Sequence, residues 1–189
     1  MGISPIIPRQ SPLVVDRMML IVRTYLIALT AWAIAGSFGG AGWAQTIGDE
    51  SEMERLRAKA EDAIGSDDPE GAAMNMGRAA LMAKRLGLLN KDDSVAIRLY
   101  RGAESLFRSQ EHGYRAMALF RRAGGQLPAS SGVCGSLALA QGSVQHALSD
   151  LAQDTLPPPP LAERSKRWRE TADDWVIVVA SMITDYQCP

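Results

Sequence analysis

The chain contains a long stretch in which apolar and charged positions recur with the period of an α-helix. Between residues 95 and 108 the apolar side chains fall on one arc of a helical wheel and the charged ones fall opposite. The apolar arc comprises Val95, Leu99, Ala103, Leu106 and Phe107 with Tyr100 at its edge, and the polar arc comprises Arg98, Arg101, Ser105 and Arg108. Glu111-His112-Gly113 interrupts this pattern, and Gly124-Gly125 closes the apolar run that follows. The spacing therefore predicts a helical hairpin over residues 97–128.

Two helices are predicted before this hairpin. The first covers residues 51–64, after a loose tail at 45–50, and Ser51 with Glu54 forms a capping box at its start. Asp68 is the expected N-cap of the second helix, with Pro69 at its first position and its end near Leu86. A turn at residues 87–90 follows, and Asp92 or Asp93 then opens the central hairpin.

After Pro128 the pattern becomes rich in glycine and alanine. Ser130-Ser131 is expected to cap a segment that ends near Gln153, with a break at Gly142-Ser143 because glycine lowers helix propensity by roughly 1 kcal/mol. Residues 157–160 are four consecutive prolines, which favour an extended linker; a ligand for an aromatic groove is the alternative.

The last segment, residues 161–186, predicts one more helix. Its apolar stripe consists of Trp168, Ala172, Trp175, Val179, Met182 and Tyr186. The β-branched run at residues 175–180 leaves a buried strand as an alternative. The whole pattern predicts an all-α fold, an array of antiparallel helical hairpins closed by a C-terminal helix.

Residues 97–128 resemble one tetratricopeptide-type repeat. The matching signature positions are Tyr100, Ala103, Glu104, Phe107, Ala116, Phe120, Ala123 and Pro128. Glu104 departs from the family pattern, which has a small residue there, and an ordinary amphipathic hairpin is the alternative. The resemblance implies a helical array that binds other proteins.

The first 44 residues have the layout of a signal peptide. Arg17 and Arg23 precede an apolar run at residues 25–35, and a glycine-rich stretch ends in small residues at Ala44. Cleavage there would leave Gln45 as the N-terminus of a single helical domain, residues 45–189, and would place it in the periplasm. Translation from Met18 or Met19 would give a more ordinary leader. An uncleaved membrane anchor at residues 24–48 is the alternative.

Charge and cysteine content narrow the choice of function. Residues 45–189 contain 17 Lys and Arg and 20 Asp and Glu, a net charge of 17 − 20 = −3, which favours neither nucleic acid nor a membrane surface. Cys134 and Cys188 are the two cysteines of the chain, and an oxidising compartment favours a disulfide between them. Closing that loop contributes on the order of 3–4 kcal/mol.

No motif for a reaction or a cofactor occurs in the sequence. Serine-hydrolase, zinc-protease, phosphate-loop and calcium-loop patterns are absent, and neither cysteine is followed by the histidine of a haem attachment site. His112, expected in a turn, and His146, expected near a helix break, are interpreted as surface residues. We therefore predict a chain without catalytic residues, metal ligands or a cofactor of its own.

Arginines dominate the charged positions of the central segment and are the candidate partner-binding residues. They are Arg98, Arg101, Arg108, Arg115, Arg121 and Arg122. An exported, mostly helical chain of this size resembles in layout the small subunit of the quinohaemoprotein alcohol dehydrogenase of acetic acid bacteria. That resemblance implies a non-catalytic accessory subunit that docks on a larger membrane-associated enzyme, with the quinone cofactor and haem c on the partner subunits. A freestanding periplasmic assembly or scaffold protein and a small enzyme with an unreadable site are the alternatives.

Overall fold

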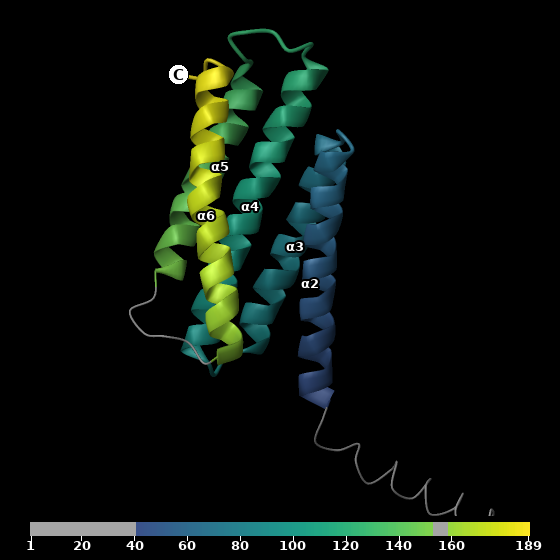
Figure 1. Cartoon of the computed structure of the whole chain (residues 1–189), viewed down its shortest axis with the longest axis vertical. Helices are drawn as coiled ribbons and strands as arrows, with labels where there is room; N and C mark the ends of the chain where they lie inside the picture. Colours follow the sequence, from purple (N-terminus) through teal and green to yellow (C-terminus); the bar gives the residue numbers. More distant parts are fainter. Residues whose placement is uncertain (1–40, 153–158) are drawn as a thin grey trace, which may run out of the picture. The chain divides into compact units, whose positions relative to one another are not determined.

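The computed structural model describes residues 41–152 and 159–189, and its elements are helices (Figure 1). They are α2 (Ala41–Gly65), α3 (Pro69–Leu89), α4 (Ser94–Arg122), α5 (Ser131–Leu151) and α6 (Pro159–Asp185). The predicted all-α class is confirmed. Most of the predicted leader and the first half of the predicted proline linker lie outside the described residues. The chain divides into two compact units at Gln45/Thr46, and the packing below is that of the unit Thr46–Pro189.

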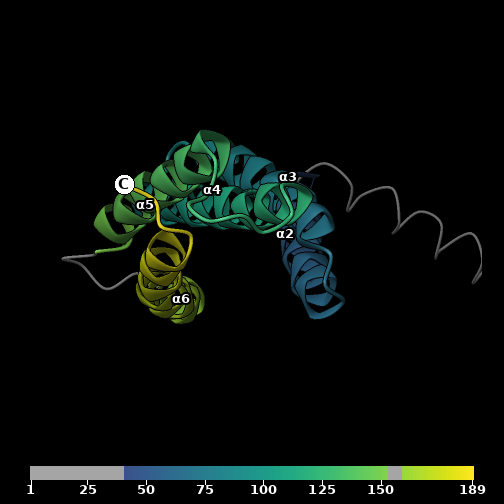
Figure 2. The ribbon, with the colours of Figure 1, turned by 90° about the horizontal axis from the view of Figure 1, so that it is seen from above.

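The five described helices form two antiparallel hairpins and a closing helix. Helices α2, α4 and α6 run in one direction, whereas α3 and α5 run in the other (Figure 1). Seen from above, α2 and α6 lie on the same side of the row formed by α3, α4 and α5 (Figure 2). This packing is compatible with a helical-repeat fold.

The hairpin predicted for residues 97–128 is wrong, because α4 is one continuous helix of 29 residues. The second hairpin of the array consists instead of α4 and α5. Glu111, His112 and Gly113 lie within α4, where Gly113 allows α6 to approach closely. A Cβ atom on Gly113 would meet the Trp175 ring at 2.8 Å. Glycine here serves helix packing and does not end the helix.

The predicted caps of α3 and α4 are confirmed. The Asp68 carboxylate accepts the backbone N–H of Gly71 at 2.9 Å, and Pro69 follows in the first turn. The Asp93 carboxylate accepts the N–H groups of Val95 and Ala96 at 2.9 and 3.0 Å. At the end of α4, Gly124 and Gly125 adopt positive φ angles of 74° and 69°, as the sequence indicated.

The boundaries of the other helices differ from the predictions in three places. Helix α2 already includes residues 45–50, so the loose tail and the capping box at Ser51 are wrong. Helix α5 continues through Gly142 because its opposite face is buried; that face includes Val133, Leu137, Ala140, Val144 and Ala147. Pro159 and Pro160 open α6 and are not part of a linker, and α6 remains helical through residues 175–180, which excludes the strand alternative.

The C-terminal helix packs through aromatic side chains on α4, which we call the aromatic seam. Trp168 lies with its ring centre 6.1 Å from those of both Tyr100 and Phe107, and Trp175 lies 5.3 Å from Tyr114. Except for Tyr186, which is partly exposed and stacks on Phe120, the predicted stripe of α6 is buried. The seam joins the middle of α6 to the part of α4 between Tyr100 and Tyr114.

Cys134 and Cys188 lie at disulfide distance, with their sulfur atoms 2.02 Å and their Cα atoms 5.4 Å apart. This agrees with the predicted pairing and ties the C-terminal residues to the start of α5. Within residues 41–152 and 159–189, no helix combines the length and apolar content that crossing a membrane requires.

Candidate protein-docking groove

Helix α3 buries Met76 and Leu86 in the core but carries three other large apolar side chains on its outside. Its buried face is built mostly from alanine, including Ala72, Ala79 and Ala83, which allows close packing against its neighbours. Met74, Leu81 and Leu88 instead point to solvent and are 61, 55 and 70% exposed. The three follow one another at intervals of seven residues and therefore lie along one side of the helix. An apolar row of this kind is typical of an interaction surface.

These residues line an open groove between α3 and α4. One part, about 540 Å³ in volume, has Met74 and Leu81 on one wall and Arg108, Arg115 and Arg122 on the other. A second part, about 260 Å³, has Leu88 on the α3 wall and Arg101 on the α4 wall. We call both parts together the α3–α4 groove.

The groove is strongly basic although the domain is acidic. Its two parts are lined by seven basic residues, Arg78, Lys84, Lys91, Arg101, Arg108, Arg115 and Arg122. Three acidic residues, Glu70, Glu104 and Glu111, also line it, which leaves a net formal charge of +4. Because residues 45–189 carry −3 in total, the rest of the domain carries −7. Positive charge is therefore concentrated along this groove, and the rest of the domain surface is net negative.

A buried glutamate holds two of the arginines in place. The Glu111 carboxylate accepts hydrogen bonds from Arg108 at 2.6 Å and from Arg115 at 2.5 Å. Glu111 itself is only 7% exposed, because its carboxyl group lies against Gly77 of α3. A Cβ atom at Gly77 would meet that carboxyl carbon at 2.9 Å. The two guanidinium groups are therefore fixed by a carboxylate between the helices.

The structure brings four of the six predicted arginines together in the groove. Arg101, Arg108, Arg115 and Arg122 recur every seven residues and form one stripe on α4. Arg121 lies elsewhere and pairs with Asp67 in the turn between α2 and α3. Arg98 is exposed and lines neither part of the groove.

The four groove arginines differ in the carboxylates that hold them, which the sequence spacing did not indicate. Arg108 and Arg115 are held by the buried Glu111, whereas Arg122 pairs with the exposed Glu70 at 2.8 Å. Arg101 forms no ion pair within the part of the chain that the structure describes. Sequence spacing alone could not distinguish the arginines that Glu111 binds from the other two, because Glu111 was interpreted as part of a turn.

A second polar cluster, not predicted from the sequence, joins three helices at the Tyr100 end of the aromatic seam. Arg164 of α6 donates hydrogen bonds to Glu50 of α2 at 2.7 and 3.0 Å and to the Tyr100 hydroxyl at 3.0 Å. The Tyr100 hydroxyl in turn donates to Glu50. Burial, together with the neighbouring Glu50 carboxylate, raises the pKa of Tyr100 above its usual value. The three residues are 50 or more positions apart, so no local signal could reveal this cluster.

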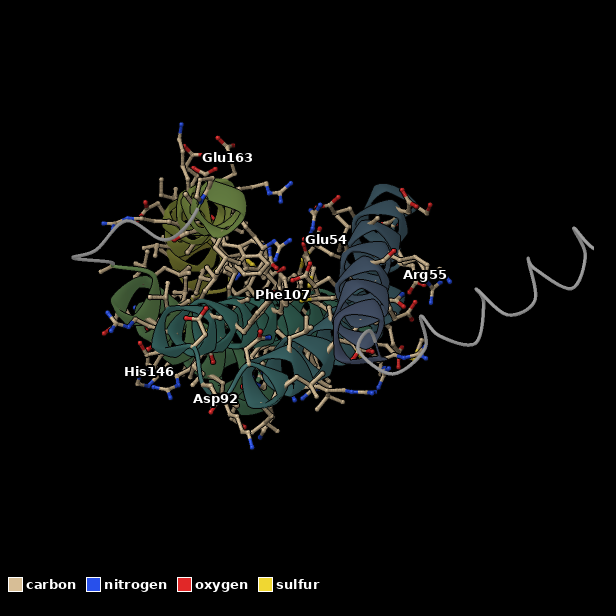
Figure 3. All side chains as sticks on the ribbon, turned by 90° about the horizontal axis from the view of Figure 1, so that it is seen from below. Glu54, Arg55, Asp92, Phe107, His146 and Glu163 are labelled. Atoms are coloured by element: carbon tan, nitrogen blue, oxygen red, sulfur yellow. A yellow bond between two sulfur atoms is a disulfide. The ribbon has the colours of Figure 1, made fainter. Side chains whose placement is uncertain are left out.

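The two histidines lie in helices, which corrects the predicted turn and break. His112 is half-buried in α4, and burial lowers its pKa below the usual value. His146 is exposed on α5, and Figure 3 shows it on the face that also carries Asp92, away from Glu54 and Phe107. Across the described ranges, no group of three or more His, Cys, Asp or Glu side chains is arranged to hold a metal ion.

Comparisons with known proteins give no match: the chain fits no family model and has no similar curated protein or solved structure.

Proposed function

We propose that the mature chain is a non-catalytic accessory subunit that docks on a larger protein through the α3–α4 groove. The observation that carries the proposal is the exposed row Met74, Leu81 and Leu88 beside a stripe of arginines. Large apolar side chains at the rim of a basic groove combine the two contributions that protein interfaces use. Apolar burial gives affinity, and charge steers and orients the partner.

The proposed partner is a larger membrane-associated enzyme in the periplasm. The layout resemblance to the small subunit of the quinohaemoprotein alcohol dehydrogenase supports that complex as the first candidate, with quinone and haem c on the partner subunits. In this proposal the chain reaches the periplasm by cleavage of the leader near Ala44 and associates with the inner membrane only through its partner. N-terminal sequencing of the native protein is then expected to begin at Gln45 or within a few residues of it.

Co-purification tests the docking function. A C-terminally tagged chain is expressed in its native host, the membranes are solubilised in detergent, and the proteins that remain bound are identified and quantified. A stoichiometric oxidoreductase supports the proposal. A set of substoichiometric, changing partners favours the freestanding scaffold instead, and recovery of the chain alone contradicts the docking function.

Charge reversal in the groove identifies the docking face. Arg101→Glu with Arg122→Glu avoids the arginines that Glu111 holds, so the fold should be retained. Partner recovery is expected to fall at least tenfold. Arg167→Glu with Arg169→Glu on α6 changes the net charge equally at exposed positions and should leave recovery unchanged. Equal recovery with both pairs would exclude the groove as the docking face.

A further inference from the structure

We propose that the α3–α4 groove accommodates an amphipathic α-helix of the partner, with apolar residues along one face and carboxylates on its flanks. This inference rests on the proposed docking function and adds the chemistry and secondary structure of the segment that docks.

The spacing of the groove residues favours a helical occupant. Met74, Leu81 and Leu88 on one wall and Arg101, Arg108, Arg115 and Arg122 on the other all recur every seven residues. At 1.5 Å per residue this repeat is roughly 10.5 Å on both walls. A helix with apolar residues at every third and fourth position presents side chains with the same repeat. A strand would present them roughly every 6.6–6.8 Å, which does not match.

The length of the groove sets the length of the docking segment. Met74 to Leu88 spans fourteen residues and Arg101 to Arg122 spans twenty-one, which correspond to roughly 21 and 32 Å of helix. The segment that fills the groove therefore has about 14 to 21 residues. Its apolar face would cover the exposed α3 row, which no described side chain of the domain covers.

The charge of the groove favours an acidic occupant. All three of its acidic residues already pair with basic residues of the groove: Glu111 with Arg108 and Arg115, Glu70 with Arg122, and Glu104 with Lys84 at 4.0 Å. Arg78, Lys91 and Arg101 form no such pair in the described ranges, so positive charge remains beside Met74 and Leu81 and at the Leu88 end of the apolar row. Carboxylates of an incoming helix would pair with these groups, and arginine can bind a carboxylate with two parallel hydrogen bonds.

Site-specific photo-crosslinking in the native host tests this inference. A photoreactive phenylalanine analogue replaces Leu81 or Leu88 in the full chain, and Leu139 of α5 and Ile177 of α6 serve as controls. The control positions are 57 and 70% exposed, which matches the 55 and 70% of the test positions. The crosslinked partner segment is then identified by mass spectrometry.

Both test positions should crosslink to one acidic segment of the partner, at points about seven residues apart, and the control positions should not. The apolar residues of that segment should recur every three or four positions. A basic segment, an alternating strand-like segment or a second copy of this chain would overturn the inference. Stable co-purification of a partner without crosslinks from either test position would overturn the helical occupant and leave the docking function standing. Failure to co-purify any partner would overturn the docking function itself.

A charge swap provides the second measurement. A synthetic peptide of the crosslinked segment should bind the Arg101→Glu, Arg122→Glu protein at least tenfold more weakly than the unmodified protein. A matched peptide with lysine at the flanking acidic positions should show the opposite preference. If the lysine peptide instead also prefers the unmodified protein, the carboxylates of the segment do not face the groove.

Discussion

Two stripes run along α4, one residue apart in the sequence, and they differ in what covers them. Tyr100, Phe107 and Tyr114 form the first stripe and pack against Trp168 and Trp175 of α6. Arg101, Arg108 and Arg115 come one residue later, about 100° around the helix, and face the open α3–α4 groove. Both stripes repeat every seven residues.

An identical repeat thus builds a core on one side of α4 and leaves an open groove on the other. The chain supplies the helix that covers the first stripe, so the apolar repeat becomes part of the core. Beside the second stripe it supplies only the exposed apolar row of α3 and the Glu111 carboxylate, which accepts hydrogen bonds from Arg108 and Arg115. Substitutions on the two sides of α4 should separate the side chains that stabilise the fold from those that we propose bind a partner.

The largest effect is expected from Trp168→Ala. Trp168 is 2% exposed and contacts both Tyr100 and Phe107, so removing the ring leaves a cavity between α4 and α6. The free energy of unfolding should fall by about 3–5 kcal/mol, measured by urea denaturation. Leu139→Ala, at an exposed position of α5, is the control and should change stability by less than about 0.5 kcal/mol. A Trp168→Ala protein as stable as the control would show that α6 does not close the core.

A smaller loss is expected where the arginine stripe serves the fold. Arg108→Ala with Arg115→Ala leaves the buried Glu111 carboxylate without its two partners, which should cost about 2–3 kcal/mol. Arg101→Ala with Arg122→Ala removes the other two members of the stripe and should cost less than about 1 kcal/mol in total. Urea denaturation of the two double variants compares them directly. Equal costs would mean that Glu111 does not hold its arginines in solution.

Short-range signals in the sequence predicted much of this structure. Asp68 and Asp93 act within one turn of their helices, and the α6 stripe is a pattern within one helix, so each could be recognised without knowing the fold. The disulfide pairing followed from there being two cysteines in a chain expected to be exported. These features depend on neighbours in the sequence or on composition.

Features that depend on distant residues were missed. Gly113 was interpreted as a break because its contact, Trp175, lies 62 positions later. The cluster of Glu50, Tyr100 and Arg164 joins three helices, so its residues are too far apart in the sequence for local spacing to predict it. The sequence placed four of the groove arginines among its candidates, but it could not show that α3 exposes an apolar row beside them.

Alkaline pH is expected to weaken the end of the aromatic seam where Tyr100 contacts Glu50. The pKa of Tyr100 is raised in the folded protein, so the folded state holds this proton more tightly than the unfolded state does. Its contribution is fully present below the unfolded pKa of about 10 and is lost as pH rises above that value. Burial also raises the pKa values of Tyr114 and Tyr186, which add to the same decline.

Tyr100→Phe isolates the Tyr100 contribution. The variant should lose about 1 kcal/mol at pH 7, because the hydroxyl no longer bonds to Glu50 and Arg164. Its stability should then fall less steeply than that of the unmodified protein between pH 10 and 11, as measured by urea denaturation at each pH. Identical slopes would place the alkaline transition in the other tyrosines.

The smallest effect on stability, combined with a large effect on binding, is expected from Leu81→Ser with Leu88→Ser. These side chains are 55 and 70% exposed and contribute little to the core, so unfolding should change by less than about 1 kcal/mol for the pair. Partner recovery should nevertheless drop at least tenfold, because the apolar row would supply most of the buried area in the groove. Leu139→Ser with Ile177→Ser removes equally exposed side chains from α5 and α6 and should affect neither quantity. A Leu81, Leu88 variant that loses stability as Trp168→Ala does would place this row in the core, and the contrast between the two stripes of α4 would disappear.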